Sequence, residues 1–174
     1  MITTVVNLFG GPGSGKSTTA AGLYYELKLR GANVEMAHEY AKDLCWEQNP
    51  RIEHQLSVFA EQCWRIQRLN GKVDFVITDS PILLSLVYGT QDESSAFRAL
   101  VREEHYRMPS FNIYVKRVKP YQSTGRYQDE ADARALDEEI GQMLFRFLGG
   151  LNYCTVPGDR GAALYIANLL TEES

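Results

Sequence analysis

Eight consecutive residues near the start of the chain have the types and spacing to bind a row of phosphates. They read G-G-P-G-S-G-K-S from Gly10 to Ser17 and fit the pattern G-x-x-x-x-G-K-[ST] throughout. Glycines let backbone N–H groups approach phosphate oxygens, Lys16 is expected to reach the β- and γ-phosphates, and the Ser17 hydroxyl is expected to ligate Mg²⁺. The predicted residues that hold Mg-ATP are Gly11, Pro12, Gly13, Ser14, Gly15, Lys16, Ser17 and Thr18.

Two acidic residues follow apolar runs that are typical of buried strands. Asp79 comes directly after the third run, and we expect it to support Mg²⁺ together with Ser17. Glu39 follows the second run, where a carboxylate can accept the proton of a hydroxyl that attacks the γ-phosphate. The alternatives are a turn acid before Pro81 for Asp79, and a surface glutamate at the start of a helix from Tyr40 for Glu39.

A basic stretch lies between residues 116 and 129 and includes Pro120 and Gly125, which favour a loop. A cationic loop of this kind can close over ATP, neutralise the migrating phosphoryl group and exclude water. Arg126 is the first candidate for this role, followed by Arg117 and Lys119; each of them alternatively serves as an ordinary surface cation.

Several features separate the classes of phosphate-binding protein. A guanine-specific N-K-x-D tetrad is absent, which weakens a GTPase interpretation. Ser80, not glutamate, follows Asp79, whereas motor ATPases usually carry an acid there to activate water. A kinase is therefore favoured, and an ATPase or nucleotide-dependent binding module is the alternative from another class. Acceptor-binding candidates are Gln55, Gln62 and Arg65, which are assigned to the polar side of a helix predicted over 51–69. The aromatic candidates are Trp46, Phe59 and Trp64, with a core role preferred for Phe59.

The elements that must position these residues follow from hydrophobic periodicity and from glycine and proline signals. Strands are predicted over 5–9, 33–37, 73–78, 111–115 and 154–156. Helices are predicted over 17–30, 51–69, 94–106, the segment around 136–147, and 162–170. The apolar face of the second helix is assigned to Ile52, Leu56, Phe59, Cys63 and Ile66, and that of the third to Phe97, Leu100 and Val101.

Strands that alternate with helices predict an α/β fold with three layers, in which helices cover both faces of a five-stranded parallel sheet. The length of 174 residues suits a single domain over 1–174. No apolar run is long enough to span a membrane, the first residues read as strand and not as a signal peptide, and the three cysteines form no metal or disulfide pattern. We therefore expect a cytoplasmic protein with free thiols and no membrane association.

The charge of the chain bears on nucleic acid as a partner. The net charge of −4 and the pI of about 5.4 argue against tight general DNA binding. Basic residues are nevertheless concentrated between 98 and 126, which predicts a local cationic patch. Its seven members are Arg98, Arg102, Arg107, Lys116, Arg117, Lys119 and Arg126.

Four segments of the sequence together carry a resemblance to a known family: Gly10–Ser17, Glu39–Ala41, Asp79–Pro81 and Lys119–Asp137. The chain resembles small bacteriophage P-loop kinases related to thymidylate kinases, and within them the 5-hydroxymethyluracil DNA kinases. The resemblance covers nearly the whole chain, although the phosphate loop itself is shared by many unrelated enzymes. Asp79-Ser80-Pro81 stands where thymidylate kinases carry an Asp-Arg-Tyr type motif, which counts against free thymidylate as the substrate.

The resemblance implies a reaction and a setting. It implies transfer of the ATP γ-phosphate to the hydroxymethyl group of 5-hydroxymethyl-2′-deoxyuridine in phage DNA, a step in thymidine hypermodification in the infected host cell. ATP and Mg²⁺ are the implied cofactors, and DNA containing 5-hydroxymethyluracil is the implied partner. A free deoxynucleoside or nucleoside monophosphate is the alternative acceptor. Lys16, Glu39, Asp79 and Arg126 are the predicted catalytic residues, with Ser17 and Asp79 as the metal ligands.

Overall fold

The computed structural model describes residues 2–89, 94–118, 130–150 and 152–171. The strands are β1 Thr4–Phe9, β2 Val34–Ala37, β3 Phe75–Thr78, β4 Ser110–Lys116 and β5 Cys154–Pro157. The helices are α1 Lys16–Leu29, α2 Tyr40–Trp46, α3 Gln55–Gln67, α4 Ser85–Tyr88, α5 Ser95–Tyr106, α6 Glu130–Leu148 and α7 Ala162–Thr171, with short 3₁₀ turns at Pro50–Glu53 and Ile82–Leu84.

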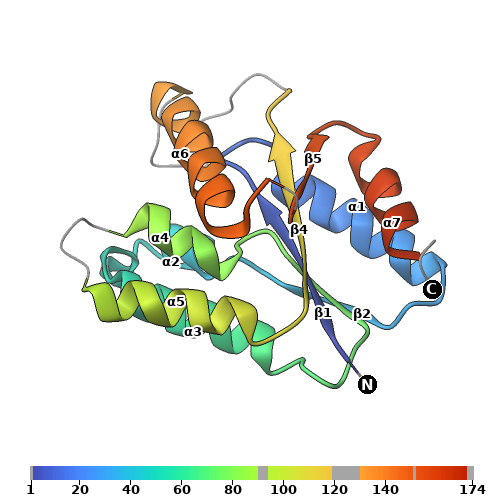
Figure 1. Cartoon of the computed structure of the whole chain (residues 1–174), viewed down its shortest axis with the longest axis horizontal. Helices are drawn as coiled ribbons and strands as arrows, with labels where there is room; N and C mark the ends of the chain where they lie inside the picture. The colour runs from blue at the N-terminus through green and yellow to red at the C-terminus, as the bar shows by residue number, and fades with distance from the viewer. Residues whose placement is uncertain (1, 90–93, 119–129, 151, 172–174) are drawn as a thin grey trace.

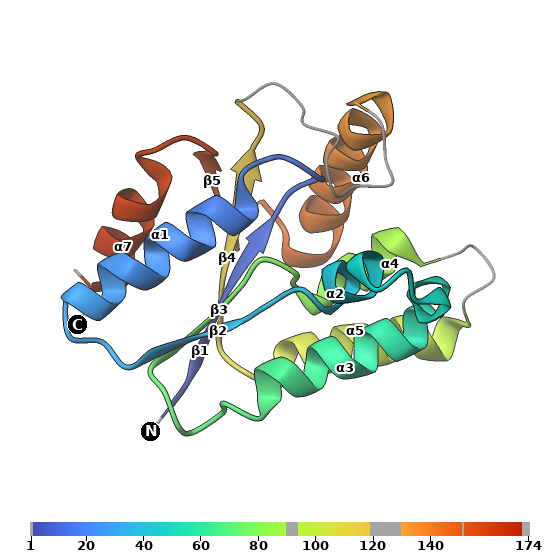
Figure 2. The same cartoon turned by 180° about the vertical axis from the view of Figure 1, so that it is seen from behind.

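The five strands form one sheet in the order β2-β3-β1-β4-β5, and every neighbouring pair is parallel. Helices α1 and α7 cover one face, while α3, α5 and α6 lie on the other side (Figures 1 and 2). The predicted α/β fold with a five-stranded parallel sheet and helices on both faces is confirmed. Parallel strands need crossover connections, and the helices supply them.

Strand β1 shows how the sequence divides between the two hydrophobic layers. Val6 and Leu8 belong to the layer under α1 and α7, while Val5 and Phe9 belong to the layer on the opposite face. Successive side chains of a strand point to opposite faces, so a strand that is buried on both sides needs a continuous apolar run. The phosphate-binding segment therefore starts from a strand held by packing on both of its faces.

The structure corrects the predicted helix over 51–69. A 3₁₀ turn covers Pro50–Glu53, His54 adopts φ −96° and ψ 85°, and α3 begins only at Gln55. The side chain of Asn49 accepts a hydrogen bond from the Arg51 N–H and so caps the short turn separately. The predicted apolar face is confirmed at Phe59, Cys63 and Ile66, which are buried, whereas Leu56 is 61% exposed and Val58 is buried in its place.

Two further differences concern the segment after β3 and the face of α5. The 3₁₀ turn Ile82–Leu84 and the four-residue helix α4 have no counterpart in the predicted elements, because both are shorter than a hydrophobic period reveals. Leu100 of α5 is 38% exposed, and His105 takes a buried position on that helix in addition to Phe97 and Val101. The buried face of α5 therefore consists of Phe97, Val101 and His105, at a spacing of four residues.

His105 makes the stability of the fold depend on pH. Its side chain is buried, and burial lowers the pKa of its imidazole to about 4. In the unfolded chain this imidazole has an ordinary pKa near 6.5 and binds a proton below that pH, whereas the folded chain keeps it neutral. The contribution of His105 to the free energy of unfolding is therefore fully present above pH 6.5 and is lost as the pH falls toward 4.

We expect urea titrations to show that the free energy of unfolding decreases by about 2 kcal/mol between pH 7 and pH 5, and that this decrease is absent from His105→Leu. Exposed His54 offers the control, since His54→Gln should retain the wild-type loss; an equal loss in His105→Leu would contradict the assignment.

Within the described ranges, no helix combines the length and the apolar character needed to cross a membrane.

Candidate active site

The segment between β1 and α1 has the backbone of a phosphate-binding loop. Gly10, Gly13 and Gly15 adopt positive φ angles of 143°, 79° and 109°, which side chains with a Cβ rarely tolerate. Gly15 stands at the N-terminus of α1 and has no side chain to cap the first N–H groups of the helix. These donors and the helix dipole are therefore available to an anion.

Lys16 lies inside this loop. Its Nζ donates hydrogen bonds to the carbonyl oxygens of Gly10 at 2.7 Å and Gly11 at 3.0 Å. Burial lowers the pKa of its ammonium group, against the opposing effect of the carboxylates of Glu39, Asp79 and Asp137. Three acids from three different segments therefore lie within electrostatic reach of one ammonium group.

The hydroxyl groups next to Lys16 differ in their surroundings. Ser17 and Thr18 are exposed, so their hydroxyls can meet a ligand from solution. Ser14 is buried, and its Oγ has no hydrogen-bond partner among the described residues. The predicted nucleotide-binding residues thus surround one anion-binding backbone turn.

The register of the sheet brings Glu39 and Asp79 to the same edge as this loop. Ala37 of β2 pairs with Thr78 of β3, and Thr78 pairs with Asn7 of β1. Glu39 and Asp79 therefore follow the carboxyl ends of two neighbouring strands at the same height in the sheet. Strand β3 is also hydrogen-bonded directly to β1, which leads into the phosphate loop. Carboxyl ends of parallel strands are the usual ligand site in such sheets.

Asp79 is 6% exposed, and its Oδ1 has no hydrogen-bond partner among the described residues. The alternative of a turn acid finds no support in the neighbouring turn, because the Ser80 N–H binds the Thr78 hydroxyl. An unsatisfied carboxylate oxygen in a buried position is costly unless a ligand completes it. Asp79 is thus available for a cation that arrives with a phosphate ligand.

Glu39 precedes α2, but its side chain makes no cap hydrogen bond to that helix. Burial raises the pKa of its carboxyl group, Lys16 opposes this rise, and the nearby charge of Asp79 adds to it. A carboxylate with a raised pKa is a better proton acceptor than an ordinary surface glutamate.

The residues present fit Mg²⁺. The described part of the chain holds no cluster of three or more histidine, cysteine, aspartate or glutamate side chains that could form a protein-only metal cage. Mg²⁺ is usually bound by one or two carboxylates, water and the phosphates of its substrate. Asp79 and the Ser17 hydroxyl would hold it here, and the ion would neutralise charge on the phosphates.

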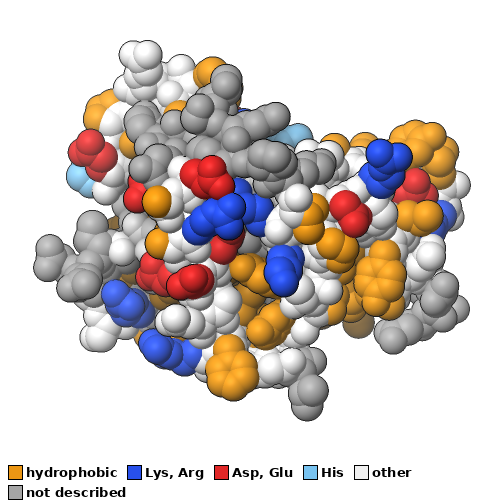
Figure 3. All heavy atoms as spheres, turned by 90° about the horizontal axis from the view of Figure 1, so that it is seen from above, with side chains coloured by type: hydrophobic (Ala, Val, Ile, Leu, Met, Phe, Trp, Pro, Cys, Tyr) orange, Lys and Arg blue, Asp and Glu red, His pale blue; other side chains and the backbone are white. Residues whose placement is uncertain are grey.

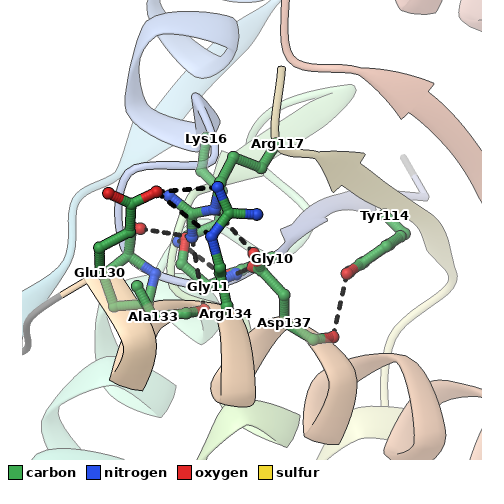
Figure 4. A network of polar contacts seen from close by, with 10 residues as sticks. Gly10, Gly11, Lys16, Tyr114, Arg117, Glu130, Ala133, Arg134 and Asp137 are labelled. Carbon is green, nitrogen blue, oxygen red and sulfur yellow. Dashed lines mark hydrogen bonds and ion pairs between the residues drawn. The ribbon is translucent and has the colours of Figure 1, made fainter. Parts of the chain in front are cut away.

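A group that the sequence analysis did not assign lies against the loop on its other side. The Asp137 carboxylate of α6 accepts a hydrogen bond from the Gly11 N–H at 2.7 Å and another from Arg117 Nε at 2.8 Å (Figure 4). Arg117 also donates to the Pro12 carbonyl oxygen at 2.7 Å. Asp137 ended the segment that carries the family resemblance, but nothing in local periodicity indicates that it contacts the loop.

The structure corrects the assignment of Gln62 to the polar side of α3. Gln62 is 3% exposed; it accepts a hydrogen bond from the Tyr40 N–H and donates one to the Thr78 hydroxyl. It therefore joins the segment after β2 to the end of β3, and these two segments carry Glu39 and Asp79. Its role in the structure is to hold the two acids in place.

The other acceptor-binding candidates have different environments. Gln55 bonds the Ser85 hydroxyl, and Arg65 forms ion pairs with Asp43 and Glu61. Phe59 is buried in the core, as expected, while Trp46 and Trp64 are 65% and 62% exposed.

Three described members of the predicted cationic patch have partners elsewhere in the fold. Arg117 is buried against the phosphate loop, Arg107 pairs with Glu104, and Arg102 lies over the Phe147 ring. Seen from above, toward the carboxyl ends of the strands, acidic and basic side chains occur together and do not separate (Figure 3). Lys119 and Arg126 lie outside the described residues.

The comparison with known proteins agrees with this geometry. The sequence profile of a family described as AAA domain matches residues 5–162, from β1 to the start of α7. No curated protein matches the chain. Because the match covers most of the chain and contains the phosphate loop, the chain belongs to the AAA domain family of P-loop nucleotide-binding proteins.

Proposed function

We propose that this protein is an ATP-dependent kinase that transfers the γ-phosphate to a hydroxyl group. The observation that carries the proposal is the position of Glu39. Its carboxyl group has a raised pKa, lies within electrostatic reach of Lys16 and Asp79, and follows a strand that ends at the edge of the phosphate loop. A proton acceptor in this position serves an attacking hydroxyl.

The proposed step balances as an in-line displacement. The acceptor oxygen forms a bond to the γ-phosphorus while the bond between that phosphorus and the β,γ-bridging oxygen breaks, which leaves ADP. The hydroxyl proton passes to Glu39. Lys16 and the loop N–H groups bind the phosphate oxygens and stabilise the charge that moves toward ADP. Arg126 is the proposed clamp on the migrating phosphoryl group, by its place in the sequence.

We propose 5-hydroxymethyluracil in DNA as the acceptor, within an infected bacterial cell. The support is the resemblance carried by Lys119–Asp137 and the presence of a proton acceptor for a hydroxyl nucleophile. The C5 substituent of a pyrimidine faces the major groove, but an enclosed cleft needs the nucleotide extruded or single-stranded. The acidic net charge of −4 favours weak, salt-sensitive contact with DNA. A free deoxynucleoside or nucleoside monophosphate is the alternative acceptor.

A transfer assay with γ-labelled ATP and Mg²⁺ tests the proposal. The acceptors are DNA with 5-hydroxymethyluracil, matched thymine DNA, and free nucleosides and monophosphates. Label only in the modified DNA is the expected result, while label in a free nucleoside replaces the substrate and keeps the kinase. ATP hydrolysis with no labelled acceptor would contradict the kinase and favour a nucleotide-dependent ATPase or binding module, a class with which the AAA domain match is equally compatible.

The pKa shifts predict a narrow pH range for kcat/KM, which reports groups of the free enzyme. Glu39 must be ionised to accept a proton, and its raised pKa moves the acidic limb above the usual carboxyl range. Lys16 must be protonated, and its lowered pKa moves the basic limb below the usual lysine range. A pH profile of transfer measures both limbs. An acidic limb at an ordinary glutamate pKa would contradict the assigned role of Glu39.

A further inference from the structure

The Asp137 carboxylate of α6 lies against the phosphate loop. Asp137 uses one oxygen for the Gly11 N–H and the other for Arg117 Nε, so that it joins the loop to the end of β4 (Figure 4). We propose that Asp137 is a positioning residue that holds the phosphate loop and Arg117 in the arrangement that binds ATP. This inference rests on the nucleotide binding that the proposed function requires.

The residue type at position 11 supports a close contact between α6 and the loop. Gly11 does not have a positive φ, so backbone conformation does not require glycine there. A Cβ on Gly11 would come within 2.8 Å of the Ala133 carbonyl oxygen and would also collide with the Asp137 carboxylate. Position 11 is one that the phosphate-loop pattern leaves open. The close approach of α6 therefore explains why position 11 is a glycine, although the phosphate-loop pattern does not require one there.

Arg117 extends the contact to the next residue of the loop. Its guanidinium donates to the Pro12 carbonyl oxygen at 2.7 Å and to the Ala133 carbonyl oxygen at 3.4 Å. The side chain of Arg117 is only 7% exposed, and that of Asp137 is 17% exposed. A buried charge needs a paired and hydrogen-bonded partner, and loss of Asp137 would remove one hydrogen-bonded ion pair from the guanidinium.

The position of α6 against this pair is itself fixed. Tyr114 of β4 donates a hydrogen bond from its hydroxyl to the Asp137 backbone carbonyl at 3.0 Å. Burial, assisted by the Asp137 charge, raises the pKa of Tyr114 to about 12, so the hydroxyl keeps its proton and remains a donor. The carboxylate therefore comes from a backbone position that is anchored to the sheet.

The consequence for binding is preorganisation. When the free loop already has the conformation that binds phosphates, no part of the binding free energy is lost in converting it from conformations that do not bind. Loss of Asp137 is expected to lower the fraction of the loop that is competent to bind ATP.

The test measures the Kd of Mg-ATP by titration calorimetry at neutral pH, with thermal melting as a check on folding. Asp137→Ala should weaken binding about tenfold to hundredfold, because a charge-assisted hydrogen bond to the loop is lost. Asp137→Asn keeps an oxygen for the Gly11 N–H but no charge. It should bind Mg-ATP more tightly than Asp137→Ala and more weakly than wild type.

Glu138→Gln provides the control, since this exposed carboxylate lies next in the chain on the outer part of α6. Equal ATP affinity in wild type, Asp137→Ala and Asp137→Asn would overturn the inference. An equal loss of ATP affinity in Glu138→Gln would also overturn the inference. Tighter ATP binding by Asp137→Ala would overturn it as well, because it would mean that the carboxylate competes with phosphate. If Asp137→Ala fails to fold, the ATP affinity of the isosteric Asp137→Asn relative to wild type decides. A wild type without ATP affinity would instead remove the proposed function, and the inference with it.

Discussion

Glu39→Gln is expected to reduce phosphoryl transfer by about 10²- to 10⁴-fold and to leave the Kd of Mg-ATP nearly unchanged. Glutamine keeps the size of the side chain and its hydrogen-bonding oxygen, but it cannot take the proton of the attacking hydroxyl. Burial raises the pKa of Glu39, and Lys16 and Asp79 lie within its electrostatic reach, so the substitution acts where bond formation occurs. Single-turnover transfer and calorimetry with ATP measure the two quantities separately.

The matched control for this experiment is Glu35→Gln. Glu35 lies on the same strand, β2, but it is exposed and makes only a 3.7 Å ion pair with Lys28. It should retain wild-type transfer. Unchanged transfer in Glu39→Gln would remove Glu39 from the mechanism, and the proposed kinase would then need another proton acceptor.

The second large effect is expected for Lys16→Met, which should lower nucleotide turnover by about 10²- to 10³-fold. The ammonium group lies inside the phosphate loop and donates hydrogen bonds to the Gly10 and Gly11 carbonyl oxygens. Phosphate oxygens are stronger acceptors and can replace these carbonyl oxygens when the nucleotide binds. Methionine keeps much of the length of the side chain without the charge. Steady-state ADP release, with the acceptor present and absent, measures the loss.

Lys28→Met on the exposed side of α1 tests whether the removal of any lysine from this helix has the same effect. It should turn over nucleotide as the wild type does. The Lys16 result does not distinguish a kinase from an ATPase, because both need the phosphates bound. Turnover that survives in Lys16→Met would contradict the assignment of Gly10–Ser17 as the site that binds the reacting phosphates.

The sequence by itself determined the phosphate loop and the elements on either side of it. The reason is that Gly10–Ser17 are contiguous, so the glycines, the lysine and the start of α1 specify one local backbone turn. The alternation of strands and helices also predicted the parallel sheet, and a parallel sheet places Glu39 and Asp79 at one edge. These conclusions depended on local patterns and on one general rule of sheet geometry.

Only the tertiary structure decided which distant side chains complete the site. Asp137 meets Gly11 across 126 residues of chain, and Gln62 connects the segments that carry the two acids from a helix face that was predicted to be polar. Periodicity predicted Phe59, Cys63 and Ile66 on the apolar face of α3 correctly, but it did not show that the helix begins only after His54, because such a break depends on capping and packing. Long-range contacts arise from the docking of whole elements, so the loop could be identified from the sequence while the residues that hold it in place could not.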